Sequence, residues 1–223
     1  MDFTFNIFAF TLIFFGTLTL FLSYYLYRKE GEAVKFFGIM MLSNAVWSLG
    51  YGFELASTDI DQVLFFIKIE YFGITTLPFN WFLFCLRFSG RDKWYKKPLN
   101  MGLLSIVPIA TILLVWTNEY HHIYFKNYTI DHSGGFPVAK FEGGILYFLF
   151  TAYFYILLAL GNYLLFAKFR AADAMYRRQN YLIMIASLIP WIANISFVTE
   201  ISPLGNIDIT PFAFIATVLF ISI

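Results

Sequence analysis

Charged residues are scarce in this chain: only 13% of its 223 residues are Asp, Glu, Lys or Arg, whereas 60% are hydrophobic and 22% are aromatic. A soluble domain of this length needs charged side chains over most of its surface, so the scarcity excludes that class. Long apolar runs separated by short charged segments indicate instead a protein that crosses a membrane several times.

Cysteine is nearly missing as well. The single thiol, Cys85, excludes an intrachain disulfide. The first six residues, MDFTFN, contain no Lys or Arg, and the apolar stretch after them is longer than the core of a signal peptide. We therefore expect that stretch to be retained as a membrane-spanning helix.

The apolar stretches predict an all-α bundle of seven membrane-spanning helices that forms one domain, residues 1–223. The expected helices cover 5–27, 36–56, 63–88, 99–117, 144–167, 180–199 and 211–223. A helix needs about 20 residues to cross about 30 Å of hydrocarbon. The last stretch holds 13 residues and reaches only about 20 Å, which predicts a fragment of a longer protein.

Basic residues are distributed unequally between the connections. Those after the first, third and fifth stretches, with their flanks, hold Arg28, Lys29, Lys35, Arg87, Arg91, Lys93, Lys96, Lys97, Lys168, Arg170, Arg177 and Arg178. Only Lys68, Lys126 and Lys140 belong to the other side. Because basic connections stay in the cytoplasm, the N-terminus is expected outside the plasma membrane and the last helix is expected to run inward.

Local signals mark several element boundaries. Asp59 with Gln62 fits a capping box that opens the third helix. Thr210 followed by Pro211 fits an N-cap and a first-turn proline. Segment 123–142 contains two short runs that tolerate β-structure around DHSGG, which predicts a small hairpin on the outer side, over the mouth of the bundle.

The stretch TNEYHHIYF, residues 117–125, places two adjacent histidines at the outer end of the fourth helix. Adjacent helical residues point about 100° apart, so His121 and His122 cannot both face one ligand. Three roles remain open: a metal site, a pH-responsive or ligand-contacting role, and interfacial capping and packing. The last is favoured, and we expect no metal or cofactor.

Polar residues recur on one face of several helices, and such a face must turn inward in lipid. The candidate ligand-binding residues are Trp47, Tyr51, Glu54, Glu70, Asn80, His121, Asn194 and Asp208. The acids could line an outer vestibule, or they could only cap helices and meet water. Asn80, Ser187 and Asn194 could instead form hydrogen bonds between helices. Lys68 is expected to point outward, away from Glu70.

The ordered set of motifs carries a resemblance to a known family. The motifs are WSLGYGFEL (47–55), EYFGITTLPFNWFLF (70–84), the proline of SIVPIA, TNEYHHIYF (117–125), Pro190 with Asn194, and DITP (208–211). The sequence resembles the N-terminal seven-helix sensor region of membrane histidine kinases.

This resemblance implies a sensor whose last helix continues into cytoplasmic modules ending in a dimeric kinase. It implies a homodimer in the full-length parent, lodged in the lipid bilayer and responding to an unknown small-molecule or lipid signal. No kinase histidine box or nucleotide-binding glycine motif occurs in the chain, so we expect no catalytic residues and no catalysis. A nucleic-acid partner is not expected.

Two other functions fit a bundle with this topology. A retinal photoreceptor needs a lysine in its last helix, and residues 209–223 contain none. A secondary transporter or proton-coupled carrier is the stronger alternative, because acids in membrane helices relay protons. Transporters often consist of repeated halves, and no convincing repeat is found in the sequence.

Overall fold

The computed structural model describes residues 2–131, 138–170, 174–199, 201 and 207–222. Its elements are α1 (Ile7–Tyr27), α2 (Glu32–Ala56), α3 (Ile60–Phe88), α4 (Pro98–Trp116), α5 (Asn118–His121), β1 (Phe125–Asp131), β2 (Val138–Gly143), α6 (Ile145–Arg170), α7 (Ala174–Val198) and α8 (Thr210–Ser222). The long helices begin and end close to the predicted positions. The largest difference is at α7, which begins at Ala174 where the prediction began at 180.

Four helices, α1, α2, α4 and α6, are long and apolar enough to cross a membrane. α3 is longer, with 29 residues, but it carries the charged residues Asp61, Lys68, Glu70 and Arg87. α8 has 13 described residues. The protein is therefore mostly helical, with four candidate membrane spans among the residues that the structure describes.

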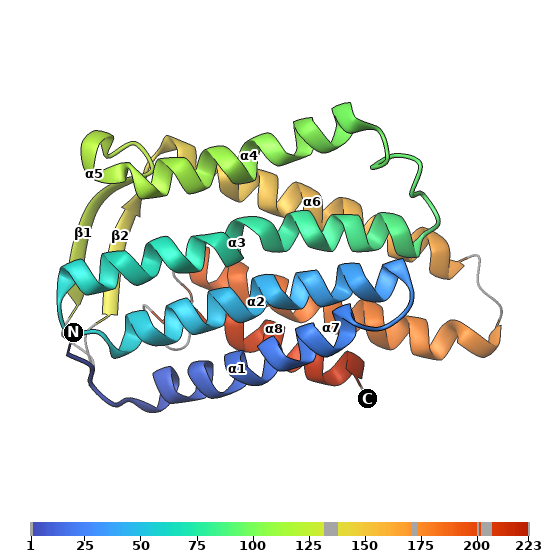
Figure 1. Cartoon of the computed structure of the whole chain (residues 1–223), viewed down its shortest axis with the longest axis horizontal. Coiled ribbons are helices and arrows are strands. Elements are labelled where there is room, and N and C mark those ends of the chain that lie inside the picture. Colours follow the sequence, from blue (N-terminus) through green and yellow to red (C-terminus); the bar gives the residue numbers. More distant parts are fainter. Residues whose placement is uncertain (1, 132–137, 171–173, 200, 202–206, 223) are drawn as a thin grey trace.

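The long helices lie side by side (Figure 1), with α2 and α3 at the centre. α1 packs against α2, while α4 and α6 pack against α3. α7 contacts α6, and α8 contacts α7, α2 and α1, which closes the bundle. The strands and α5 lie at one end, which we name the strand end. The α1–α2 and α3–α4 connections lie at the other, which we name the basic end.

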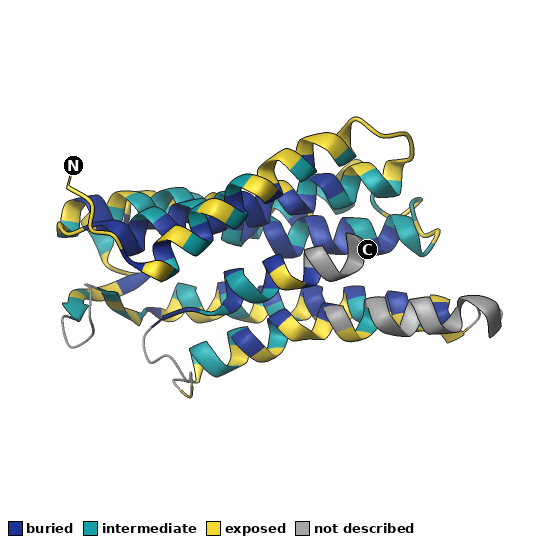
Figure 2. Cartoon of the chain, turned by 90° about the horizontal axis from the view of Figure 1, so that it is seen from below, coloured by how far each residue is buried: buried dark blue, intermediate teal, exposed yellow. Residues whose placement is uncertain are grey.

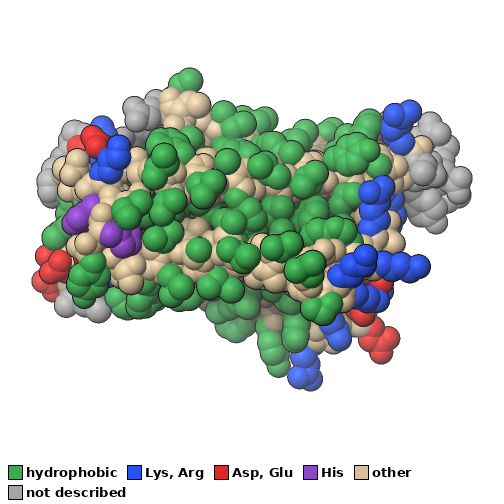
Figure 3. Space-filling view, turned by 90° about the horizontal axis from the view of Figure 1, so that it is seen from above, with side chains coloured by type: hydrophobic (Ala, Val, Ile, Leu, Met, Phe, Trp, Pro, Cys, Tyr) green, Lys and Arg blue, Asp and Glu red, His purple; other side chains and the backbone are tan. Residues whose placement is uncertain are grey.

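The surface of the bundle is apolar between its two ends. Figure 2 shows buried positions where helices face one another and exposed positions on their outer faces. The exposed positions include large apolar side chains such as Phe14 and Phe21 of α1 and Leu113 of α4. In the face seen in Figure 3, Lys and Arg gather at the basic end, and hydrophobic side chains cover the middle. An apolar belt of this kind is suited to contact with lipid tails.

α2 and α3 approach one another closely at two glycines. A Cβ atom on Gly73 would lie 2.4 Å from the backbone oxygen of Ser43. A Cβ atom on Gly50 would lie 2.7 Å from the Cβ of Glu70. Small residues let helix backbones touch in membranes. The contact at Gly50 brings Glu70 against α2, one helical turn from Glu54.

The predicted hairpin is confirmed. β1 pairs with β2 in antiparallel fashion, with Tyr128 opposite Phe141 and Asp131 opposite Val138. The remaining residues of the predicted turn, 132–135, lie outside the described part of the chain. The hairpin lies at the strand end, next to the start of α6 (Figure 1).

The predicted caps are partly correct. Asp59 is the N-cap of α3, and its carboxylate accepts a hydrogen bond from the Gln62 backbone at 3.4 Å. The reciprocal half of the box is not formed, because Gln62 Nε2 has no partner among the described residues. The predicted cap at Thr210 is wrong by one residue. Ile209 O accepts the first helical hydrogen bond of α8, from Ala213 N at 3.1 Å.

Candidate functional site

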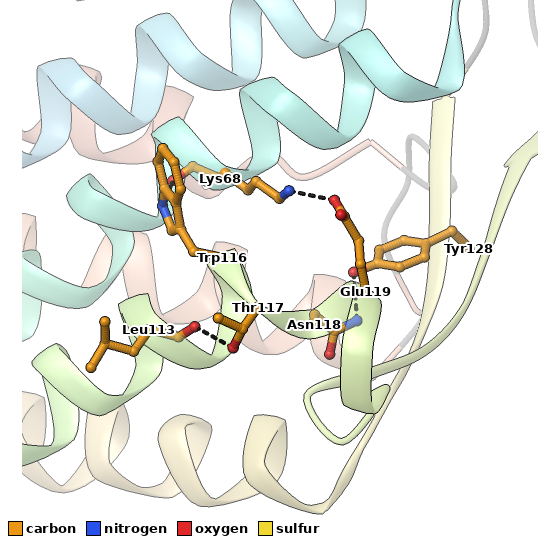
Figure 4. A network of polar contacts seen from close by, with 7 residues as sticks. All are labelled: Lys68, Leu113, Trp116, Thr117, Asn118, Glu119 and Tyr128. Atoms are coloured by element: carbon orange, nitrogen blue, oxygen red, sulfur yellow. Dashed lines mark hydrogen bonds and ion pairs between the residues drawn. The ribbon is translucent and has the colours of Figure 1, made fainter.

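The TNEYHHIYF stretch is organised by Asn118 rather than by its histidines. Asn118 is fully buried, and its side chain makes four hydrogen bonds. Oδ1 accepts from the backbone N–H groups of Tyr124 (3.1 Å) and Phe125 (3.0 Å). Nδ2 donates to Phe125 O (2.9 Å) and to the Tyr128 hydroxyl (2.8 Å), the second contact being drawn in Figure 4. Asn118 thus holds the base of the hairpin against the end of α4.

The two histidines complete the turn that follows α5. His122 has a left-handed backbone, with φ 50°, and its N–H donates to Asn118 O at 2.9 Å. His121 Nδ1 accepts from the Ile123 backbone at 3.1 Å, and Nε2 lies 3.2 Å from Thr117 Oγ1. These contacts agree with the capping role. Among the described residues, no group of three His, Cys, Asp or Glu side chains is arranged to hold a metal.

Lys68 connects α3 to the same turn. Its ammonium group forms an ion pair with Glu119 (Figure 4), and its backbone oxygen accepts from Trp116 Nε1 at 3.2 Å. Lys68 therefore points away from Glu70, as expected, but it is held by a partner.

A cavity of about 80 Å³ lies between α2, α3, α6, α7 and the hairpin. It is lined by Trp47, Tyr51, Glu54, Glu70, Tyr71, Ile74, Ala139, Phe141, Tyr147, Phe150, Thr151, Phe154, Asn194, Phe197, Val198 and Asp208, and we name it the acidic cavity. A cavity needs roughly 10–15 Å³ to hold one water, so the volume suits a few waters or one small chemical group. Six of the eight predicted site residues line it; Asn80 and His121 do not.

The acids meet because of helix periodicity and the contact at Gly50. Trp47, Tyr51 and Glu54 follow one another at steps of four and three on α2, so they share one face. Glu70 reaches that face from α3. Asp208 arrives from the connection before α8, where its backbone N–H donates to the Tyr51 hydroxyl at 2.7 Å.

The cavity contains buried carboxyl groups without a basic partner. Glu54, Glu70 and Asp208 are at most 9% exposed, and the described lining includes no Lys, Arg or His. Glu54 and Glu70 both line the cavity, and Glu70 Oε2 has no hydrogen-bond partner among the described residues. Burial raises the pKa of Asp208 to about 6, and hydrogen bonds from Thr210 partly oppose this effect.

A second set of hydrogen bonds joins the cavity to the start of α8. Asn194 of α7 accepts from the Tyr155 hydroxyl of α6 at 2.6 Å and donates to Thr210 Oγ1 at 3.2 Å. The Thr210 backbone N–H donates to Asp208 Oδ1 at 2.8 Å. The first residue of α8 is thus bonded both to Asn194 and to a cavity acid.

Asn194, Asp208 and Thr210 lie in the segments that carry the resemblance to sensor regions, and a comparison with family models agrees. The model for the N-terminal 7TM region of histidine kinase matches residues 11–223. The chain belongs to this family. It is a multi-pass membrane protein of the sensor type, and the resemblance seen in its motifs is confirmed. No curated protein matches the chain.

Two polar residues of the sensor region connect helices away from the acidic cavity. Asn80 Nδ2 donates to Ser43 Oγ at 2.9 Å, which joins α3 to α2. Ser187 Oγ donates to Asn162 Oδ1 at 2.8 Å, which joins α7 to α6. Both bonds agree with the interhelical role considered for these residues. Asn80 does not line the acidic cavity, because its amide is turned toward Ser43, and its role in ligand binding stays a prediction.

Sequence reasoning missed the wall of the cavity that α6 and β2 supply. Tyr147, Thr151 and Phe154 follow one another at steps of four and three on α6, and Phe141 comes from β2. The helical spacing of Tyr147 and Thr151 was the available signal. Since aromatic residues make up 22% of the chain, their presence in α6 did not distinguish this face.

Proposed function

We propose that this chain is the signal-input module of a sensor histidine kinase, with the acidic cavity as its ligand site and α8 as its output. In this proposal seven helices cross the membrane of the cell, with the strand end outside. The ligand, a small molecule or a lipid-derived signal, enters from the outer side or from the membrane. The full-length protein acts as a homodimer in the bilayer and has no nucleic-acid partner.

The orientation is supported by the basic side chains gathered at one end of the bundle (Figure 3). Connections rich in Lys and Arg remain in the cytoplasm. In a Cys85→Ser background, a single cysteine at position 59 should react with an impermeant thiol reagent in intact cells. A cysteine at position 96 should react only after lysis, and its labelling in intact cells contradicts the proposed orientation.

The observation that carries the proposal is that two side chains of the cavity wall are hydrogen-bonded to residues at the start of α8. Tyr51 lines the cavity and accepts the hydrogen bond from the Asp208 backbone, and Asn194 lines it and bonds Thr210. A ligand that changes the position of either side chain changes the contacts that fix the first turn of α8.

Transmission requires two arrangements of the helices. A ligand shifts their populations only by as much as it binds one arrangement more tightly than the other. In this account, one arrangement keeps the bonds to Asp208 and Thr210, and the other exchanges them for contacts with the ligand. α8 then moves relative to α2, and the kinase reads that movement.

A chimera in which α8 continues into a histidine kinase core tests this function. Glu70→Gln should change the autophosphorylation level of the chimera by several-fold, because it alters the cavity next to Tyr51. Lys68→Gln is the matched control, since Lys68 pairs with Glu119 outside the cavity. Equal and negligible effects of both substitutions contradict the proposal. Flux of protons or solutes in liposomes that depends on Glu70 supports the carrier alternative.

A further inference from the structure

We propose that the ligand of the acidic cavity is a small organic cation that carries a protonated amine. The proposal rests on the sensor function only in using the same cavity. Three properties of the cavity carry it: an oxygen without a hydrogen-bond donor, the sign of the lining charges, and the aromatic walls.

The unsatisfied oxygen is Oε2 of Glu70. The residue is only 6% exposed, lines the cavity, and has no hydrogen-bond partner at this atom among the described residues. A buried polar atom without a partner is unfavourable, and buried carboxylates normally find a donor. An ammonium group presents three N–H donors and no acceptor, so it can bond Oε2 while keeping donors for Glu54 or Asp208.

The acidic side chains of the cavity lining favour a positively charged ligand. Three carboxyl groups meet in the cavity, and the described lining contains no basic side chain. The nearest lysine in sequence, Lys68, is occupied by Glu119 on another face of α3. Without a cation, negative charges on Glu54 and Glu70 would repel each other inside the bundle. A protonated amine supplies both the positive charge and the donors.

The walls favour an organic cation over a metal ion. Aromatic rings from α2, α3 and α6 surround the acids, including Trp47, Tyr71, Phe150 and Phe154. The faces of such rings attract ammonium groups and pack against their carbon atoms. Ca²⁺ instead takes six to eight oxygen ligands, and Mg²⁺ takes six. The described residues contain no cluster of three potential ligands with metal-binding geometry.

The volume limits the size of the ligand. A cavity of about 80 Å³ suits an ammonium head with a few carbon atoms. The hairpin residues Ala139 and Phe141 belong to its wall at the strand end.

The test uses the 223-residue chain purified in an uncharged detergent, with n-propylammonium chloride as the probe. Titration calorimetry should show saturable binding of propylammonium and none of 1-propanol, its neutral counterpart, or of CaCl₂. Binding should weaken at least tenfold in Glu70→Gln and stay unchanged in Glu142→Gln, which removes an exposed acid of β2. Asp208→Asn provides a second cavity variant if Glu70→Gln does not fold.

Three results overturn the inference: equal binding of 1-propanol, equal binding of propylammonium by the cavity variants, or binding of Ca²⁺ alone. These outcomes are separable from failure of the sensor function. Amine binding that leaves the kinase activity of the chimera unchanged contradicts the sensor proposal only. Kinase control that depends on Glu70 without amine binding contradicts the ligand class only.

Discussion

The Asp208 backbone N–H donates a 2.7 Å hydrogen bond to the Tyr51 hydroxyl, across 157 positions of the sequence. This bond joins the cavity face of α2 to Asp208. The carboxylate of Asp208 in turn accepts a hydrogen bond from the backbone N–H of Thr210, the first residue of α8. Because both residues line the acidic cavity, a change within the cavity has a short route to α8.

Replacing Tyr51 by Phe should release the start of α8. The substitution keeps the ring but leaves the buried Asp208 N–H without its acceptor, which costs about 1–3 kcal/mol. We expect a lower thermal midpoint of the purified chain and an altered autophosphorylation level of the kinase chimera.

Tyr153→Phe is the matched control. The Tyr153 hydroxyl donates to Leu104 O at 2.9 Å and joins α6 to α4, away from α8. This variant should lose stability but keep the normal kinase level. If both variants change the kinase activity equally, the Tyr51 bond has no special role in output.

Gly50→Ala should separate α2 from α3 at the level of the acids. The new methyl carbon would lie 2.9 Å from the Glu70 backbone nitrogen, so the helices must move apart. Such overpacking typically costs about 1–3 kcal/mol. Gly102→Ala in α4 is the control, because no atom of another described segment lies within 4 Å of its Cβ position. Thermal unfolding in detergent should show a loss for Gly50→Ala only; equal midpoints would show that the helix contact is loose.

Asn118→Ala should detach the hairpin from the bundle. The substitution removes four hydrogen bonds, and each buried group left without a partner costs about 1–3 kcal/mol. Limited proteolysis should cut segment 125–143 faster in this variant. The control is Asn127→Ala, whose amide makes one exposed contact with Glu142. Similar cleavage of the two variants contradicts the role assigned to Asn118.

The raised pKa of Asp208 predicts that the free energy of unfolding declines as pH rises from about 4 to about 6. Its pKa increases from 3.8 to about 6 on folding because of burial, so the unfolded chain releases the proton first. The contribution of Asp208 to the free energy of unfolding is fully present below pH 4. It falls by about 3 kcal/mol as pH rises past 6. Glu54, Glu70 and Tyr51 face the same group, so the Asp208→Asn variant is needed to isolate the effect. Its unfolding curve should lack this decline; parallel curves would contradict the prediction.

The fold was largely predictable because apolar length and polar periodicity are local properties of the sequence. These patterns predict the helix over 63–88 and place Glu54 and Glu70 on helix faces that turn inward. The convergence of Glu54 and Glu70 depends on Gly50, and a glycine in a membrane helix does not itself reveal which helix it touches. The start of α8 was located within one residue, but the bond from Asp208 to Tyr51 joins distant segments and has no local signature.

The hairpin illustrates the same limit. The β-tolerant runs predict its strands, whereas the sequence around Asn118 does not indicate that this residue fixes the base of the hairpin. Asn118 bonds residues six to ten positions further along the chain, which depends on the path of the turn. Short polar residues are common in loops between a helix and a strand. The residue type of Asn118 therefore does not indicate its role at the base of the hairpin.

The most direct measurement of the central claim, that α8 carries the state of the cavity into a kinase, is the autophosphorylation of three chimeras. One has a native junction after α8, one has a single inserted residue, and one has seven. A single insertion rotates all following residues by about 100°, whereas seven residues restore the phase to within about 20°. We predict altered kinase activity and loss of the Glu70 dependence with one inserted residue, and near-native behaviour with seven. If all three chimeras behave alike, α8 is only a tether and the account is wrong.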